Sequence, residues 1–375
     1  MNYNRIRTKN DRKKDMKVQD LIHEKSELTH GKSLPEPIVL STRIRLARNL
    51  EGYNFPDWSN IETRKEVLRL CSNEIIKLKA MKVAEEFDCD QMTETEKRAL
   101  VERHLISPEF AQMGEGSGVL INEDQSIAVM INEEDHLRIQ VLRRGYQFKS
   151  AWQEMDELDN QIDERLDYAF SGQLGYLTAC PTNLGTGMRA SIMLHLPGLV
   201  IVGQIEKVIR ACSHLNLAVR GIYGEGSDAI GSIFQISNQQ TLGESEVEII
   251  KKLTGVLDTV IEQEKNVRNQ ILAQERVKIF DKIGRAFGIL RNAHSVTSDE
   301  AMNLLSLMRL AVDLGILPSQ YRTIIDSFLI ESQPAHIQLM MGEDIKLEHR
   351  DSFRAMLLKQ KFKEIDSLNF DNIKT

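Results

Sequence analysis

The stretch Gly118-Val-Leu-Ile-Asn-Glu-Asp-Gln-Ser-Ile-Ala-Val-Met-Ile131 decides the fold class of this 375-residue chain. It holds two apolar runs separated by Asn122-Glu-Asp-Gln125, and this arrangement predicts a β-hairpin. Other strands are predicted over 174–178, 217–222 and 232–236, and helices over 63–78, 152–170 and 199–216. Hairpins mixed with helices, rather than strict βαβ repeats, favour an α+β fold built on an antiparallel sheet.

The strand signals stop after Asn238, and helical patterns follow. Apolar residues first recur at helical spacing at Val247, Ile250, Leu253, Val256 and Val260. Further helices are predicted over 271–290, 298–314, 320–332 and 351–368. We therefore expect a mixed domain over 37–267 and an all-helical C-terminal domain over 268–375. Residues 1–36 are charged and aperiodic, and they are predicted to be an N-terminal tail.

The composition is that of a globular protein, with 41% hydrophobic and 27% charged residues. A net charge of −7 argues against a dedicated nucleic-acid binder, because counterion release from nucleic acid requires clustered Lys and Arg. No apolar run follows the basic N-terminal residues, as a signal peptide would require. No stretch approaches the ~20 apolar residues of a membrane span. We expect a cytoplasmic protein that does not bind membranes.

The four cysteines are Cys71, Cys89, Cys180 and Cys212. They form no CxxC pair and have no zinc-ligand spacing, so they fit a reducing compartment and no metal site on the protein is expected.

Ser41-Thr-Arg-Ile-Arg45 is the first segment that carries chemistry. On a strand, Arg43 and Arg45 point to one face and Ile44 points to the other. Two adjacent guanidinium groups suit a polyphosphate, because arginine binds phosphate bidentately and keeps its charge. A solvated strand edge is the alternative interpretation.

Asn132-Glu-Glu-Asp-His-Leu-Arg138 follows directly on the apolar run that ends at Ile131. Three consecutive acids repel one another unless a cation lies among them. A guanidinium substrate would be such a cation, and one carboxylate could accept its proton. Arg138 is close enough to bind phosphate. The alternative is an ordinary charged turn.

Two glycine-containing segments complete the set. Cys180-Pro-Thr-Asn-Leu-Gly-Thr-Gly-Met-Arg189 follows a predicted strand, and its backbone amides could approach an anion. Cys180 would become thiolate-prone among cations, although a packed cysteine is the alternative. Arg220-Gly-Ile-Tyr-Gly-Glu-Gly-Ser-Asp228 is predicted to be a lid that offers one cation and one carboxylate, with a plain hairpin loop as the alternative.

Together, in this order, the four segments resemble the catalytic domain of the phosphagen (ATP:guanidino) kinases over about residues 38–267. The resemblance implies an eight-stranded antiparallel sheet flanked by helices, with ATP and its Mg²⁺ as cofactors. It also implies that Glu134 and Glu225 clamp the guanidinium, that Glu134 is the base and that Cys180 is a thiolate against the substrate. His104 would stack on the adenine.

The resemblance further implies that five arginines bind the ATP phosphates: Arg43, Arg45, Arg138, Arg189 and Arg220. The whole set of implied nucleotide contacts is Ser41, Thr42, Arg43, Ile44, Arg45, His104, Arg138, Arg189, Ala190, Ser191, Ile192, Met193, Arg220, Gly221, Ile222, Tyr223, Gly224 and Glu225.

Small-molecule phosphagen kinases place a helical domain before the catalytic domain, whereas here a short segment precedes it and helices follow. That order, with Leu105-Ile-Ser-Pro108 and Arg220–Ser227, is similar to the bacterial protein-arginine kinases. The C-terminal Arg350-Asp-Ser-Phe-Arg-Ala355 matches an element of that family that binds phosphoarginine allosterically, through Arg350, Asp351, Arg354 and Ala355. From chemistry alone, an ordinary charged helix surface is the alternative.

This second resemblance implies partners: protein substrates with exposed arginine, an activating zinc-binding adaptor, and a Clp chaperone–protease that degrades the marked proteins. A stress-gene repressor, inactivated by phosphorylation, and a homo-oligomer are also implied. A small-molecule arginine kinase is the alternative function, and a non-catalytic phosphoarginine-binding adaptor is a second. A serine/threonine kinase is disfavoured because the HRD, DFG and lysine motifs are missing.

Overall fold

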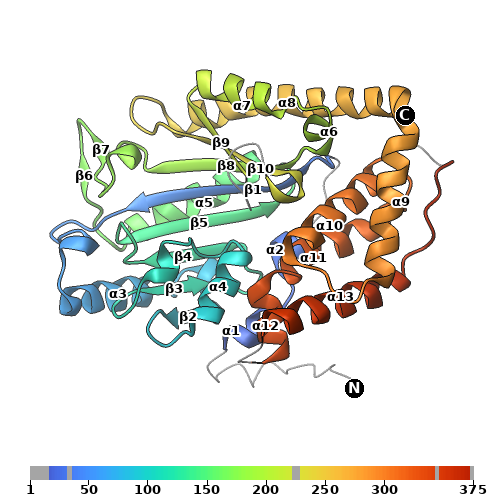
Figure 1. The fold of residues 1–375 in the computed structure, drawn as a ribbon. Coiled ribbons are helices and arrows are strands. Elements are labelled where there is room, and N and C mark those ends of the chain that lie inside the picture. The colour runs from blue at the N-terminus through green and yellow to red at the C-terminus, as the bar shows by residue number, and fades with distance from the viewer. Residues whose placement is uncertain (1–16, 32–35, 222–228, 343–345, 372–375) are drawn as a thin grey trace.

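The structure is a computed structural model that describes residues 17–31, 36–221, 229–342 and 346–371. Its centre is an eight-stranded antiparallel sheet in the order β2-β3-β4-β5-β1-β8-β10-β9 (Figure 1). The strands are β1 (Val39–Arg48), β2 (Glu85–Asp88), β3 (Gly118–Ile121), β4 (Ile127–Ile131), β5 (Leu137–Arg144), β8 (Met188–His195), β9 (Leu217–Gly221) and β10 (Ile233–Asn238). The predicted α+β fold and the hairpin of β3 and β4 are confirmed.

A separate two-stranded hairpin contains β6 (Phe170–Ser171) and β7 (Gly175–Tyr176). The strand predicted over 174–178 therefore shrinks to two residues. After Tyr176 the chain makes only single backbone contacts, such as the hydrogen bond from Leu177 N to Ala169 O (2.9 Å), before it enters the Cys180 loop.

The helices in the first two thirds of the chain are α1 (Val18–Leu21), α2 (Glu27–His30), α3 (Ile61–Ile75), α4 (Glu94–Glu102), α5 (Phe148–Asp163), α6 (Pro197–Ile201) and α7 (Ile205–His214). The helix predicted over 199–216 is two helices, because the chain turns at Gly203 with a φ of 69°. The helix predicted over 152–170 ends early, since Tyr168 forms a β-bridge with Leu50.

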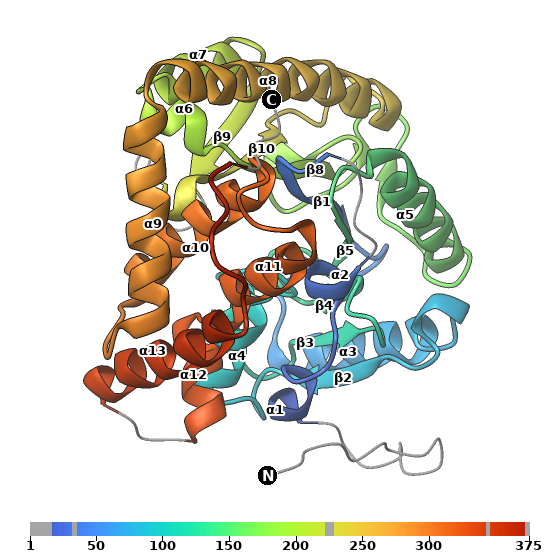
Figure 2. The ribbon, with the colours of Figure 1, turned by 90° about the vertical axis from the view of Figure 1, so that its right-hand side faces the viewer.

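The C-terminal helices are α8 (Glu246–Gln274), α9 (Arg276–Asn292), α10 (Ser298–Asp313), α11 (Arg322–Glu331), α12 (Pro334–Met341) and α13 (Leu347–Lys363). Figure 2 shows α9 to α13 gathered on one side of the sheet. The predicted boundary between 267 and 268 lies inside α8, which is continuous, and the nearest break is at Glu275. The division into two domains stays a prediction.

The alternation of β1 gives the sheet two different faces. Ile44 and Leu46 point to an apolar face, which α3, α5 and α8 cover. On the opposite face, α1 and α4 cover only the end of the sheet formed by β2, β3 and β4, where a second core cluster lies. The middle of this second face, where β1, β5 and β8 run, carries polar side chains.

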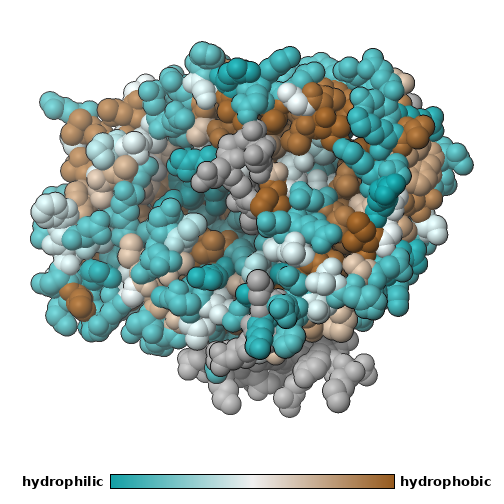
Figure 3. Space-filling model, viewed as in Figure 1, coloured by the Kyte–Doolittle hydropathy of each residue, from teal (hydrophilic) through white to brown (hydrophobic). Residues whose placement is uncertain are grey.

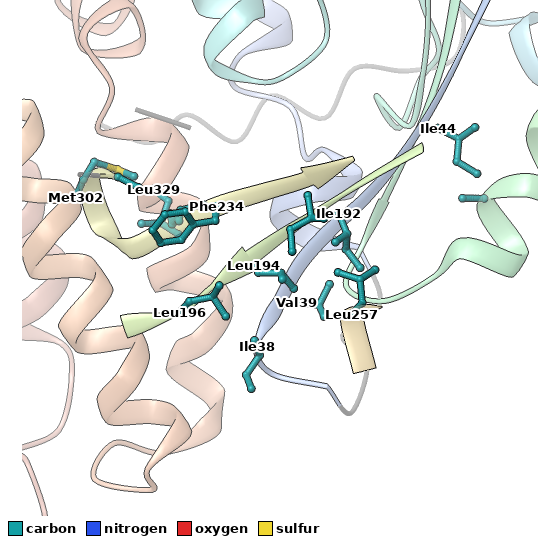
Figure 4. Close-up of a cluster of buried hydrophobic side chains, with 14 of the residues drawn as sticks. Ile38, Val39, Ile44, Ile192, Leu194, Leu196, Phe234, Leu257, Met302 and Leu329 are labelled. Atoms are coloured by element: carbon teal, nitrogen blue, oxygen red, sulfur yellow. The ribbon is translucent and has the colours of Figure 1, made fainter. Parts of the chain in front are cut away.

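The apolar core continues from the sheet into the C-terminal helices. Figure 4 shows Leu194, Phe234 and Leu257 in one cluster that extends to Met302 of α10 and Leu329 of α11. The C-terminal helices and the sheet thus bury apolar surface against each other, which stabilises their relative position.

A buried ion network strengthens this contact. Glu264 of α8 accepts hydrogen bonds from the backbone N–H groups of Gly198 and Leu199, at the start of α6 (2.9 Å each). Arg268, one turn later, donates to Glu264 (Nε to Oε1, 2.6 Å) and to Asp313 of α10 (Nη1 to Oδ2, 2.7 Å). Each buried carboxylate therefore has N–H partners, which offset the cost of removing it from water.

Asp326 of α11 makes a second connection to the sheet. Its carboxylate accepts hydrogen bonds from Arg144 Nη2 of β5 and from Arg309 Nε of α10, each at 2.9 Å. All three side chains are buried. Because both partners are cationic, the pair of bonds fixes α10 and α11 against a strand in the middle of the sheet.

Residues 17–31 differ from the predicted tail, because they form α1 and α2 and pack against the rest of the chain. Val18 and Leu21 of α1 lie in the core cluster of α4. Glu27 of α2 accepts a hydrogen bond from Arg144 N of β5 (Oε1, 3.1 Å). These helices have four residues each, too few to show a periodic pattern in the sequence.

Within the part of the chain that the structure describes, no helix has both the length and the apolar character needed to cross a membrane.

The ion network predicts a large stability loss when Asp313 loses its charge. Burial raises the pKa of Asp313, but Arg268, Arg309 and Arg322 outweigh burial and hold the pKa below its ordinary value. We expect Asp313→Asn to lower the free energy of unfolding by about 3–5 kcal/mol, because it removes one negative charge from a buried network that holds Arg268, Arg309 and Arg322. Urea denaturation at neutral pH measures this change.

The matched control is Asp281→Asn, which removes an exposed carboxylate of α9 that pairs with Arg285 (2.7 Å). Solvent screens this surface pair, so the free energy of unfolding should stay essentially unchanged. Equal losses for the two variants would contradict a structural role for the network.

Candidate active site

Strand register brings four arginines together in the middle of the polar face. Arg45 of β1 lies opposite Arg189 of β8, and Arg43 lies opposite Ser191. On the other side of β1, Arg138 of β5 lies opposite Ala47. Residues opposite one another in antiparallel strands share a face, so the four guanidinium groups converge from three neighbouring strands.

The cluster is electrostatically strained. Burial, with repulsion from Arg138 and Arg189, lowers the pKa of Arg43 to about 9. Burial and then Arg43 lower the pKa of Arg45 well below its ordinary value. The Nε atoms of Arg45 and Arg189 are buried and have no hydrogen-bond partner among the described residues. Guanidinium groups held together in this way need an anion, and a polyphosphate matches their geometry.

Neutral side chains hold two of these arginines in place. Arg43 Nη2 donates to Gln235 Oε1 (2.6 Å), and Arg189 Nη2 donates to Ser237 Oγ (3.1 Å). Because these partners carry no charge, they do not neutralise the two guanidinium groups, whose positive charge stays available to bind an anionic ligand. Gln235 and Ser237 of β10 were not identified from the sequence, since only the register with β8 reveals that they face the cluster.

Arg138 has a charged partner instead. It donates to Glu133 Oε1, which also accepts a hydrogen bond from Ser107 Oγ (2.9 Å). The other oxygen of Glu133 is buried without a hydrogen-bond partner among the described residues. Glu133 therefore orients Arg138 at the edge of the cluster, a role that the sequence did not single out.

Two adjoining pockets lie beside Arg43. The first is lined by Ser41, Arg43, His104, Leu142, Ser191, Met193 and Gln235. The second is mostly apolar, with Leu28, Leu40, Met193, Ile233, Leu329 and Ile330 in its walls. A nucleotide whose phosphates are bound by the arginines could direct its purine base toward this apolar pocket. Figure 3, in the same view as Figure 1, shows hydrophilic residues around a hollow near the centre of the molecule.

His104 lines both pockets, and its contact with the adenine stays a prediction. It has a φ of 60°, and its carbonyl oxygen accepts a hydrogen bond from Gln140 Nε2 (2.7 Å), which fixes this turn. Burial, with a smaller contribution from Arg43, lowers the pKa of His104 to about 3. The imidazole is therefore neutral at pH 7 and can stack on a base.

Glu134 and Cys180 meet at the other end of the cluster. Burial raises the pKa of Glu134, and the neighbouring Asp135 and Glu133 raise it further, against Arg138 and a hydrogen bond with Cys180. The Cys180 Sγ atom lies 3.0 Å from Thr182 Oγ1. A carboxylate whose pKa is raised toward neutrality can accept a proton efficiently.

Asp135 holds the Cys180 loop against the acidic segment. Its Oδ1 atom accepts hydrogen bonds from Asn49 Nδ2 (2.6 Å) and from the backbone N–H of Ala179 (2.7 Å). His136, the next residue, accepts from Leu50 N through Nδ1 (3.1 Å). The third acid and the histidine of the segment are therefore structural. The role of Asn49 could not be predicted from the sequence, because its hydrogen bond with Asp135 joins residues 86 positions apart.

Several of the predicted nucleotide contacts point away from the cluster. The side chains of Thr42, Ile44, Ala190 and Ile192 lie on the apolar face, because they alternate with Arg43, Arg45, Arg189 and Ser191. Thr42 Oγ1 donates to Gly145 O (2.7 Å) and accepts from Gln147 N (2.9 Å). Only the backbone of these four residues could therefore contact a nucleotide that is bound to the arginine cluster on the opposite face.

Arg220 and Gly221 end β9, and Arg220 lies opposite Gln235 of β10. Arg220 is exposed and shares the face of the cluster, where it contributes to the lowered pKa of Arg189 after burial. Ile222, Tyr223, Gly224 and Glu225 lie outside the described residues.

The C-terminal Arg350–Ala355 element lies on α13. Arg354 is buried and donates to Ser332 O (2.7 Å), Val296 O (2.8 Å) and Asp351 Oδ1 (2.5 Å). Ala355 is also buried, whereas Arg350 is half-buried and donates to Gln338 Oε1 (3.2 Å). In this conformation Arg354 joins α13 to neighbouring loops, and of the four predicted phosphoarginine contacts only Arg350 and Asp351 reach the surface.

Among the described residues, no group of three or more His, Cys, Asp and Glu side chains could hold a metal ion.

Two family models match the chain. The first, ATP:guanido phosphotransferase, C-terminal catalytic domain, matches residues 66–267. The second, Protein-arginine kinase McsB C-terminal domain, matches residues 276–373. The two matched regions meet near the end of α8, close to the break at Glu275.

Solved structures of guanidino kinases share the fold. A lombricine kinase superposes with a TM-score of 0.56 and 28% identity, covering 64% of this chain and 70% of that chain. The duplicated taurocyamine kinase from Schistosoma mansoni gives a TM-score of 0.55 and 25% identity, covering 66% of this chain and 38% of that longer chain.

Relatives of known name match almost the full length. A protein-arginine kinase from Halothermothrix orenii is 44% identical over 345 residues, which cover 92% of this chain and 99% of the relative. A protein-arginine kinase from Brevibacillus brevis is 43% identical over 340 residues, which cover 90% and 95%. The chain therefore belongs to the protein-arginine kinases, within the ATP:guanido phosphotransferase family.

Proposed function

We propose that this enzyme transfers the γ-phosphoryl group of ATP to the guanidinium group of arginine side chains in proteins. The observation that carries the proposal is the arginine cluster, which has no carboxylate partner except Glu133 among the described residues and adjoins Glu134 and Cys180. One end of the site suits a polyphosphate, and the other end suits a cationic acceptor.

The arginines align the nucleotide and stabilise the transferred group. In phosphoryl transfer, catalysis comes mainly from positioning and from charge stabilisation, since the transition state spreads charge over the phosphoryl oxygens. Arg43, Arg45 and Arg189 would bind these oxygens, because two of their buried Nε atoms have no other hydrogen-bond partner. Mg²⁺, carried by the nucleotide, would supply further neutralisation of its phosphates.

Glu134 acts on the acceptor. A nitrogen of the arginine attacks the γ-phosphorus, and the bond from phosphorus to the bridging oxygen breaks with its electron pair, so that ADP leaves. The proton of the attacking nitrogen passes to Glu134, whose raised pKa suits it to hold that proton. Cys180, hydrogen-bonded to Glu134, would lie against the guanidinium and support its orientation.

The choice of protein arginine over free arginine is supported by the C-terminal helices. Residues 276–373 match a domain named for protein-arginine kinases, and the relatives of that name match almost the whole chain. The small-molecule kinase remains the competing function, and the acceptor assay below separates the two.

Other expectations from the family extend this proposal. Glu225 would complete the guanidinium clamp, and Arg350, Asp351, Arg354 and Ala355 would bind phosphoarginine, for which Arg354 must leave its buried contacts. An activating zinc-binding adaptor, a Clp chaperone–protease, a stress repressor as substrate, a homo-oligomer and a cytoplasmic location remain predictions for this chain.

The acceptor assay tests the function directly. Incubated with γ-labelled ATP, the enzyme should label an arginine-rich protein faster than free arginine at equal arginine concentration. The label should be lost in acid and retained in base, because protonation of a phosphorylated guanidinium promotes P–N hydrolysis. Faster labelling of free arginine would support the small-molecule kinase, and an acid-stable label would exclude arginine as the acceptor.

Glu134→Gln tests the base. We expect a loss in kcat of about 10²–10⁴, the usual contribution of general base catalysis, with unchanged ATP affinity. Because the pKa of Glu134 is raised, wild-type activity should fall as pH drops through a value above the ordinary ~4.3 of glutamate. The residual activity of the variant should lack this acid limb. An identical limb in both proteins would assign the titration to another group.

Arg43→Lys tests the phosphate site. Lysine keeps the charge but loses the planar fork, so we expect kcat/KM for ATP to fall by about 10²–10³. The control is Arg143→Lys, on the same strand as Arg138 but on the opposite face, where Arg143 pairs with Glu154. The control should retain wild-type kcat/KM, and an equal loss in both variants would argue against a specific role of Arg43.

A further inference from the structure

An open groove lies outside the site described above, between the β6–β7 hairpin and the segment that leads into α8. It is wide and open to solvent. Its walls are formed by residues within 170–176, 185–186 and 241–246. These residues come from three segments that are well separated in the sequence.

The floor of the groove is rigid because backbone packs directly on backbone. A Cβ atom on Gly175 would lie 2.5 Å from Gly185 O, and a Cβ atom on Gly185 would lie 2.5 Å from Thr241 O. Hydrogen bonds from Tyr176 N to Gly185 O (2.8 Å) and from Thr186 N to Thr241 O (3.1 Å) lock the three segments together. The groove is therefore formed before any ligand binds.

Large apolar side chains are exposed on and beside the groove. Phe170 is 58% exposed, Leu174 44% and Leu242 53%, and Val247, next to the groove residue Glu246, is 64% exposed. Figure 3 shows hydrophobic residues over the β6–β7 hairpin at the upper left. Such a gathering of exposed apolar side chains around a concave surface marks an interaction site.

The groove and the acceptor end of the active site share one loop. Cys180 Sγ lies 3.0 Å from Thr182 Oγ1, and the carbonyl oxygens of Thr182 and Leu184 accept hydrogen bonds from Thr241 Oγ1 (2.8 and 2.7 Å). The groove residue Gly185 is five positions after Cys180 in the sequence, so their Cα atoms are at most about 18 Å apart. An extended peptide of about six residues can span this distance.

The charge of the groove favours a cationic ligand. Its only charged lining residues are Glu244 and Glu246. Glu244 pairs with Lys252 (2.9 Å), whereas Glu246 is half-buried at the start of α8 and has no ion-pair partner among the described residues. A segment that presents arginine is cationic, so the acidic rim attracts it and the apolar walls can bind a flanking side chain.

We infer that the groove binds the polypeptide on either side of the arginine that is phosphorylated, with an apolar residue a few positions away packed against Phe170, Leu174 and Leu242. This inference rests on the proposed function, since it assigns the groove to the protein substrate. Free arginine has no flanking residues, so the groove would favour arginine within a polypeptide.

Two synthetic peptides test the inference. Each is twelve residues long with one central arginine, and one carries leucine on both sides, four positions from the arginine, where the other carries serine. We expect wild-type enzyme to show a KM about tenfold lower for the leucine peptide, the lower end of what one apolar contact contributes. The double variant Phe170→Ser, Leu242→Ser should lose this preference and keep its kcat and its KM for ATP.

Val277→Ser is the matched control, because Val277 is 83% exposed on α9 and lies outside the groove. It should keep the wild-type preference. Equal KM values for the two peptides with wild-type enzyme, or an unchanged preference in the double variant, would overturn the inference. A double variant that changes only the oligomeric state would also overturn it, by assigning the groove to contact between copies of the chain. Failure to label arginine in either peptide with wild-type enzyme would instead refute the proposed function.

Discussion

Repulsion among the four guanidinium groups that converge on the polar face is the constraint that the rest of the structure has to satisfy. Arg43, Arg45 and Arg189 face one another across two strands with neutral partners or with none among the described residues. Such an arrangement persists only if the surrounding fold stabilises it by more than the repulsion costs. The central position of β1 meets this need, because its other face is buried under α3, α5 and α8.

The C-terminal helices extend that support. Asp326 joins α10 and α11 to Arg144 of β5, and Arg268 joins α8 to Asp313 and to the carbonyl oxygen of His195 at the end of β8. Both strands also carry an arginine of the cluster. The helices are therefore fixed to the strands that carry arginines of the cluster. A movement of α10 or α11 would pull on these strands.

Local patterns were sufficient for much of the fold and of the site. The alternation around Ile44 predicted the shared face of Arg43 and Arg45, and the hairpin over 118–131 followed from two adjacent runs. The partners of the arginines could not be predicted, because Gln235 is 192 positions from Arg43 in the sequence and reaches it across the intervening strand β8. The burial of Arg354 could not be predicted from the sequence either. Charged residues at i,i+3 or i,i+4 spacing occur both on exposed helices and on packed ones.

The central position of β1 has a consequence for synthesis on the ribosome. β1 emerges long before β5 and β8, the two strands that flank it. Until those strands follow, Ile44 and Leu46 have no partner in the sheet, and the nascent chain exposes an unpaired, apolar strand. Non-local pairing of this kind folds slowly and is prone to aggregation. A kinase of this architecture would therefore be at risk of aggregation during its own synthesis, until β5 and β8 have been made.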